Sequence, residues 1–101
     1  MANSYDVGDL IRLSITFKVG STPTDPTTIT FRILSPDGTV TEYIYATDDE
    51  LVRDSDGVYH VDWIPDVKGV WAYRWEATGA VIEAEQAKFN VRPAEPAAVT
   101  P

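Results

Sequence analysis

The sequence contains no cysteine among its 101 residues. That absence excludes a disulfide framework, a thiolate nucleophile and a zinc site built on cysteine. Long apolar runs are also missing, since none approaches the roughly 20 residues that a membrane-spanning helix needs. Residues 1–6 contain neither the basic nor the apolar part of a signal region. We therefore expect no membrane partner and a fold that is stabilised by packing alone.

Positive charge is scarce. The chain has 8 lysine and arginine residues against 16 aspartate and glutamate residues, which gives a formal net charge of −8. Affinity for a phosphate backbone depends on lysine and arginine, and here these residues are scattered along the chain rather than clustered. We therefore expect no nucleic-acid partner.

Aromatic residues are plentiful, above all between residues 58 and 91. Tyr59 and Trp63 have one parity in a first strand-like segment, and Trp71, Tyr73 and Trp75 share one parity in the next. Alternate residues of a strand point to the same face, so each segment has one aromatic face. Two such faces, turned toward each other, predict the core of a β-sandwich.

The link between these two segments resembles the E–F corner of immunoglobulin-like domains. Asp66, Gly69, Trp71 and Tyr73 have the spacing of that corner, in which a conserved aromatic precedes the second sheet-bridging cysteine by two residues. Trp71 takes the place of the aromatic residue and Tyr73 that of the cysteine. A core of this kind specifies a scaffold and does not by itself name an activity.

The rest of the chain also has the pattern of short strands. Apolar residues alternate with polar ones from Leu10 onward, and turn-forming residues recur between the segments. Residues 40–46 form a third strand, and residues 80–91 form the last one. This last strand has a bulge, because Val81 and Phe89 share a parity that Ile82 and Ala84 do not have. No segment has a helical period. The sequence thus predicts an all-β fold, an immunoglobulin-like β-sandwich of about seven antiparallel strands without a disulfide.

The chain divides into three parts in this interpretation. Residues 1–9 form an N-terminal arm, residues 10–91 form the sandwich, and residues 92–101 form a C-terminal arm rich in proline and alanine. An extended arm can bind a partner surface, so the candidate partner-binding residues in it are Arg92, Pro93, Pro96 and Val99.

Two tyrosines of the third strand are further candidates for partner binding. Tyr43 and Tyr45 share a face and could form a flat aromatic platform for a sugar ring or a protein. Alternatively, both tyrosines belong to the core and Ile44 faces outward. We favour the second interpretation because aromatic residues are common on the inner faces of strands.

No constellation in the sequence predicts catalysis or a cofactor. His60 and Asp62 fall on an outer face as a solvated pair, without a nucleophile for a triad or enough ligands for a metal. Residues 54–57 look superficially like a calcium loop, but the EF-hand pattern fails because Pro65 stands where its last glutamate is needed. A turn stabilised by aspartate side chains explains the same residues. We therefore expect no enzyme, no cofactor and no metal site, and an interstrand calcium site at the acidic turn is the alternative.

Several motifs together resemble small immunoglobulin-like virion proteins of tailed bacteriophages and prophages. The motifs lie in residues 5–13, 25–28, 35–39, 57–62 and 69–76. The resemblance implies a head-decoration protein or a component of the head–tail region. It implies no catalytic residues.

From the resemblance we expect a non-enzymatic structural protein of the virion, made in the host bacterial cytoplasm. It would dock on capsid, neck or tail proteins in multiple symmetric copies. The alternative is a carbohydrate- or cell-surface-binding module that uses Tyr43 and Tyr45, with a glycan as its ligand. An accessory domain of a bacterial surface assembly is a third hypothesis.

Overall fold

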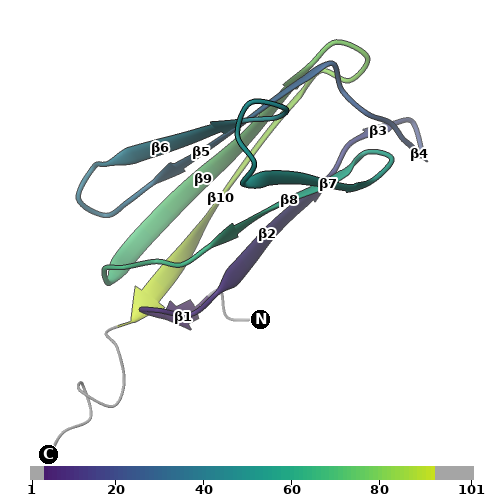
Figure 1. Ribbon diagram of the computed structural model, residues 1–101. Coiled ribbons are helices and arrows are strands. Elements are labelled where there is room, and N and C mark those ends of the chain that lie inside the picture. The colour runs from purple at the N-terminus through teal and green to yellow at the C-terminus, as the bar shows by residue number, and fades with distance from the viewer. Residues whose placement is uncertain (1–3, 93–101) are drawn as a thin grey trace, which may run out of the picture.

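Alternating apolar residues form strands throughout residues 4–92, the part of the chain that the computed structural model describes (Figure 1). No helix occurs among these residues, and so none that could cross a membrane. Ten strands occur in this range: β1 (Ser4–Asp6), β2 (Ile11–Thr16), β3 (Lys18–Val19), β4 (Thr22–Pro23), β5 (Thr28–Leu34), β6 (Val40–Ile44), β7 (Leu51–Ser55), β8 (Val58–Trp63), β9 (Gly69–Thr78) and β10 (Glu83–Arg92).

Two sheets pack face to face, as Figure 1 shows. One has five strands in the order β1-β10-β9-β5-β6, and the other has three in the order β2-β8-β7. The short strands β3 and β4 form a separate two-stranded ribbon. The chain is thus an immunoglobulin-like β-sandwich without a disulfide, as the sequence predicted.

The expected N-terminal arm is partly a strand. Residues 4–6 form β1, which pairs in parallel with the end of β10, and Val7 continues this contact by donating its amide to the carbonyl of Arg92 over 3.1 Å. The ring of Tyr5 packs edge-on against Phe89, with ring centroids 5.6 Å apart. The arm prediction was therefore wrong for these residues, because a three-residue strand is too short to show alternation in the sequence.

Aromatic side chains fill the space between the sheets. Phe31 and Trp75 are almost completely buried, and their ring centroids lie 4.7 Å apart. Burial of one such side chain stabilises a fold by roughly 1.5–3 kcal/mol. The core therefore needs no disulfide.

At the corner between β8 and β9, the expected aromatic residue, Trp71, bonds back to the backbone. The indole Nε1 of Trp71 donates a hydrogen bond to the carbonyl of Val67 over 3.1 Å. This bond runs back to the backbone a few residues upstream, as the tyrosine of an immunoglobulin corner does. Tyr73, in the place of the cysteine, packs against the core with part of its side chain exposed.

The last strand differs from its prediction. β10 begins at Glu83, and it pairs with β9 without a break from Glu83 to Val91. The predicted bulge was wrong because Val81, although buried, precedes the strand and does not fix its register. The irregular register lies in β7 instead, between Arg53 and Ser55.

Candidate functional site

The outer face of the five-stranded sheet presents side chains in rows that cross four strands. β6, β5, β9 and β10 pair in register, so residues that face one another belong to one row. The first row, called the apolar row below, consists of Val40, Leu34, Ala72 and Lys88. Val40 is 58% exposed and Leu34 is 42% exposed. Apolar side chains are thus gathered on an open face, where a partner could cover them.

The next row, called the charged row, consists of Glu42, Arg32, Arg74 and Gln86. Its two arginines face each other directly across β5 and β9. Glu76, from the following row, bridges them: Oε1 lies 2.6 Å from Nη1 of Arg32, and Oε2 lies 2.7 Å from Nε of Arg74. One carboxylate thereby offsets the repulsion between two guanidinium groups.

The outer members of the charged row complete the network. Arg32 donates its Nε to Glu42 Oε2 over 2.8 Å, and Arg74 donates its Nη1 to Gln86 Oε1 over 2.7 Å. The two arginines hold the pKa of Glu76 below its ordinary value, with Arg74 contributing more. All of these groups are at least partly exposed, so water and salt weaken the attraction between them.

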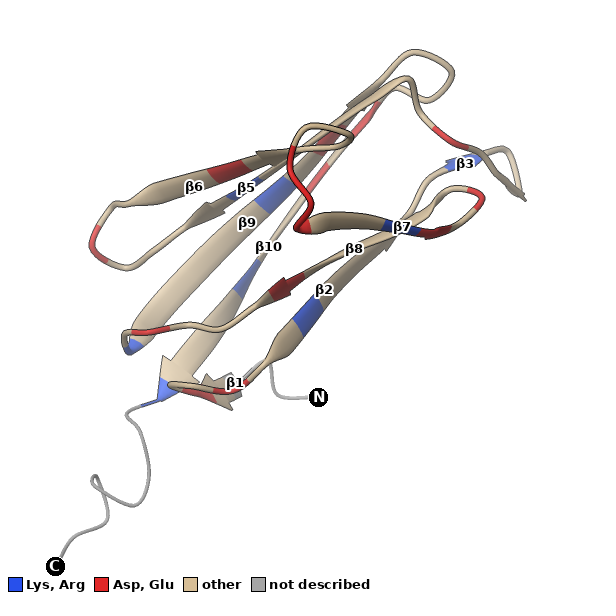
Figure 2. Cartoon of the chain, viewed as in Figure 1, with Lys and Arg blue, Asp and Glu red and all other residues tan. Residues whose placement is uncertain are grey.

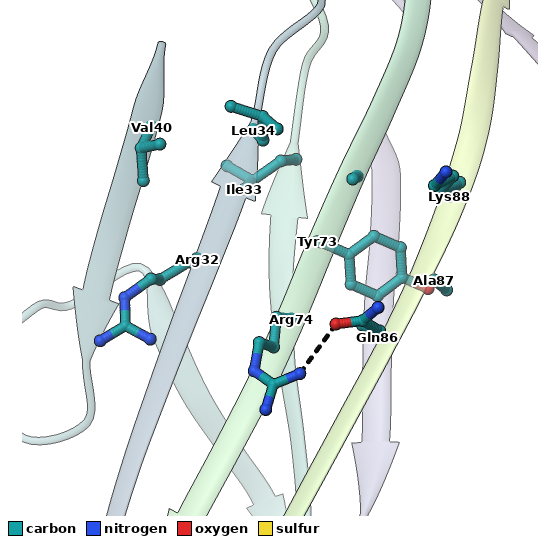
Figure 3. Close-up of a pocket in the computed structure, with 10 residues that line it drawn as sticks. Arg32, Ile33, Leu34, Val40, Tyr73, Arg74, Gln86, Ala87 and Lys88 are labelled. Carbon is teal, nitrogen blue, oxygen red and sulfur yellow. Dashed lines mark hydrogen bonds between the residues drawn. The ribbon is translucent and has the colours of Figure 1, made fainter. Parts of the chain in front are cut away.

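A hollow of about 380 Å³ lies over the two rows. Ala72 forms its floor because a methyl group leaves space between the longer side chains of Leu34 and Lys88 on the neighbouring strands. Figure 3 shows Arg32 and Arg74 at one side of the hollow and Lys88 at another. No ion pair within residues 4–92 includes Lys88.

Basic residues are concentrated on this face. Four of the eight lysines and arginines of the chain occur there: Arg32, Arg74, Lys88 and Arg92. Figure 2 shows these basic positions along β5, β9 and β10, while many of the acidic residues occupy loops. Arg32, Arg74 and Arg92 are each paired with a carboxylate, so within residues 4–92 Lys88 is the cation of this face that is left to meet an acidic group of a partner.

The predicted tyrosine platform is not on the outer face. Tyr43 stacks on Phe31 with ring centroids 6.4 Å apart, and Tyr45 meets Tyr59 edge-on at 5.2 Å. Ile44 between them is 40% exposed. The structure thus places both tyrosines against the core, as the favoured interpretation expected. Their role in partner binding stays a prediction.

Of the C-terminal candidates, only Arg92 belongs to the described residues. It ends β10, and its Nε lies 3.0 Å from Oδ1 of Asp6 on β1. Pro93, Pro96 and Val99 lie outside the described residues.

His60 is buried rather than solvated, which corrects the prediction. It has the expected outward parity but is only 6% exposed, since β8 is the middle strand of its sheet and its neighbours crowd the ring. Its Nδ1 lies 2.8 Å from Oδ2 of Asp54, whereas its Nε2 lies 3.9 Å from Oδ2 of Asp62. Asp62 is held instead by Arg12, whose Nε lies 2.9 Å away. Of the two carboxylates near His60, the predicted partner Asp62 therefore makes the longer contact and Asp54 the shorter one.

The acidic turn of residues 54–57 has both of its carboxylates engaged by neighbouring side chains. Asp54 contacts His60, and Asp56 pairs with Arg53. Residues 4–92 contain no group of three or more histidine, cysteine, aspartate or glutamate side chains placed to hold a metal ion. Hydrogen bonds and ion pairs account for the turn in this part of the chain.

Asp25 is a central residue that the sequence analysis missed. Its carboxylate accepts hydrogen bonds from Arg53, from the amide of Gly57 over 2.8 Å and from the hydroxyl of Tyr59 over 2.9 Å. These bonds lower the pKa of Asp25 to about 2, with the Arg53 bond contributing most. They tie the loop before β5 to the turn between β7 and β8. No local pattern shows this, because the partners lie about thirty residues away.

The rows on the outer face were missed as well. Their even-numbered residues alternate visibly with the core residues of β5 and β9, so their outward direction could have been predicted. Which outward residues become neighbours depends on the strand register, and the sequence does not display that.

No family model and no curated protein matches this chain. Several solved structures are similar to it, among them the following two. A proposed glycoside hydrolase from Bacteroides vulgatus matches 92% of this chain at 17% identity with a TM-score of 0.62, although the match covers only 17% of the Bacteroides chain. The filamin domain of Lin-41 matches 89% of this chain at 11% identity with a TM-score of 0.66, and 83% of that domain is covered. At these identities the likeness concerns the fold, which is that of an immunoglobulin-like sandwich.

Proposed function

We propose that this chain is a non-enzymatic docking domain that serves as a structural protein of a tailed-bacteriophage virion. It docks on capsid, neck or tail proteins, in multiple symmetric copies, after synthesis in the host bacterial cytoplasm. The outer face of the five-stranded sheet makes the contact.

The observation that supports docking most is the pair of rows beneath the hollow. Val40 and Leu34 expose apolar surface beside Lys88, and the charged row borders them. An apolar strip next to positive charge fits an extended segment with apolar and acidic residues. Many symmetric copies would make a modest single contact sufficient, because linked contacts bind with high avidity.

The virion setting follows from the sequence resemblance described above. The motifs that resemble phage proteins fall in strands and turns of the sandwich, and one of them, residues 69–76, contributes Ala72 and Arg74 to the two rows. The motifs support the setting, while the outer face supports the mode of action. The glycan alternative loses its proposed stacking groups on the surface, since Tyr43 and Tyr45 pack against the core.

Particle incorporation tests this proposal. Particles are purified from a strain that encodes the chain, and their proteins are identified by mass spectrometry. Val40→Lys adds a buried charge to any contact over the apolar row, so we expect at least about a tenfold loss of the protein from particles. Val52→Lys is the matched control, because Val52 is also an exposed strand valine but belongs to the three-stranded sheet.

Two outcomes would overturn the proposal. Absence of the wild-type protein from particles would refute the virion role. Equal incorporation of Val40→Lys and Val52→Lys, with both variants folded by circular dichroism, would refute docking through the outer face.

A further inference from the structure

The three-stranded sheet ends in an open edge at β2. β8 pairs with β2 on one side, and no strand within residues 4–92 pairs with it on the other. β2 is six residues long, and its register with β8 is regular throughout. A regular edge strand of this length is a template for the addition of another strand.

The backbone direction at this edge can be deduced from one hydrogen bond. The amide of Phe17, just beyond β2, donates to the carbonyl of Gly57 beside β8. Amide and carbonyl groups of an antiparallel strand alternate in direction, so odd-numbered residues of β2 bond to β8. The backbone N–H and C=O groups of Arg12, Ser14 and Thr16 therefore point to the open edge.

Within residues 4–92, no strand covers the inner face of the opposite sheet on the same side of the sandwich. β1 leads into β2, and β6 leads into β7, so the β2 edge corresponds to the β1 and β10 end of the larger sheet (Figure 1). The inward parity of β10 is that of Phe89 and Val91, both buried. Residues 83, 85 and 87 share this parity, yet Glu83 is only partly buried and Glu85 is exposed.

Electrostatics agrees that Glu85 points inward. Tyr73, on the inner face of β9, has a raised pKa, caused first by burial and then by the charges of Tyr5 and Glu85. Two acidic side chains thus border the place where a fourth strand of the smaller sheet would lie. Inward charges of this kind discourage apolar strands and select for a strand of opposite charge.

We propose that the open edge of β2 binds an extended segment of another protein, which adds a strand to the three-stranded sheet. The segment has lysine or arginine at the inward positions that face Glu83 and Glu85, and small apolar residues at the inward positions nearer Ala87. Its backbone forms hydrogen bonds with the backbone N–H and C=O groups of Arg12, Ser14 and Thr16. This contact does not depend on the hollow.

The edge at β7 is a poor competitor for such a segment. Its register is interrupted between Arg53 and Ser55, and the Arg53 side chain is engaged by Asp25 and Asp56. Bulges and charged side chains are the usual means of blocking an edge. β2 has no such interruption. Of its outward side chains, Arg12 is charged and is held by Asp62 on β8, while Ser14 and Thr16 are small and neutral.

The test uses a synthetic nine-residue peptide with blocked ends. Threonine occupies every other position of the peptide, including both ends. The positions between the threonines are valine near each end and lysine in the middle, so that one face of the strand is apolar and basic. A control peptide has glutamate in place of lysine. Binding is followed by NMR of the full chain, with hydrogen exchange at the amides of Arg12, Ser14 and Thr16. We expect these amides to become protected by the lysine peptide, and the glutamate peptide to bind at least about tenfold more weakly.

Two variants separate strand addition from simple charge attraction. Ser14→Pro removes an outward amide without touching the bonds to β8, and it should weaken binding about tenfold, whereas Ser14→Ala should bind as the wild type does. Glu85→Lys should reverse the preference between the two peptides. The Glu85→Lys variant keeps the test usable even if proline at position 14 prevents folding.

Three results would overturn the inference. The three amides could already exchange slowly in the free chain, which would mean that the edge is covered. Folded Ser14→Pro could bind as tightly as Ser14→Ala. The lysine peptide could bind without protecting the three amides, which would place it elsewhere on the acidic surface.

Discussion

Two networks of arginine and carboxylate in this molecule have the same chemistry and different surroundings. At Asp25, one carboxylate joins Arg53 to a backbone amide and to the hydroxyl of the buried Tyr59. At Glu76, one carboxylate joins Arg32 and Arg74, and all its partners are side chains on an open sheet face.

The difference shows what an ion pair contributes in each place. The Asp25 network connects a loop to a distant turn, so its loss leaves a buried hydroxyl and a backbone amide without their acceptor. The Glu76 network connects strands that the sheet already pairs, so its loss removes only exposed attractions. We conclude that Asp25 stabilises the fold, whereas the Glu76 network shapes a surface.

The largest expected effect concerns the backbone beside Asp25. Gly57 has φ +74°, and a Cβ there would lie 2.5 Å from the carbonyl oxygen of Phe17 and 2.6 Å from the amide of Thr24. Gly57→Ala should therefore destabilise the protein by at least about 3 kcal/mol, measured by urea unfolding.

Gly38→Ala is the matched control for that measurement. Gly38 also has a positive φ, of +94°, but nothing lies within 4 Å of its added Cβ. Its cost should be about 1 kcal/mol, from the left-handed backbone alone. Equal losses at Gly57 and Gly38 would contradict the close approach of the two loops.

The next effect is a pH dependence that belongs to Asp25. Its pKa falls from 3.8 to about 2 on folding, so its contribution is complete above pH 4 and is lost as the pH falls toward 2. Asp25→Asn should unfold more easily than wild type at pH 7, and the two should converge near pH 2. Thermal unfolding across this pH range measures the difference. A constant difference from pH 7 to pH 2 would show that the charge of Asp25 is not the cause.

The smallest expected effect is at Glu76. Glu76→Gln removes the carboxylate between Arg32 and Arg74, so the melting temperature should fall only slightly at low salt. The fall should be smaller still in 0.5 M salt, because the Debye length is then about 4 Å and exposed charges are screened. A fall as large as that of Asp25→Asn would remove the distinction between the two networks.

Much of the fold could be predicted from local patterns. The alternation from Ile11 onward and the aromatic faces of β8 and β9 indicated a sandwich, and the spacing at Trp71 indicated its corner. β1 was missed because three residues show no period, and the bulge was misplaced because Val81 is buried without belonging to a strand. The burial of His60 was missed because parity gives a direction and says nothing of crowding.

The candidate site was beyond those patterns. Sequence alone determined that Arg32, Arg74 and Glu76 point away from the core, because side chains alternate along any strand. Only the tertiary structure decided that they meet, that Asp25 reaches Gly57, and that β2 is left at an edge. The physical reason is that alternation is a property of one strand, whereas register and strand order depend on the packing of segments that are far apart in the chain.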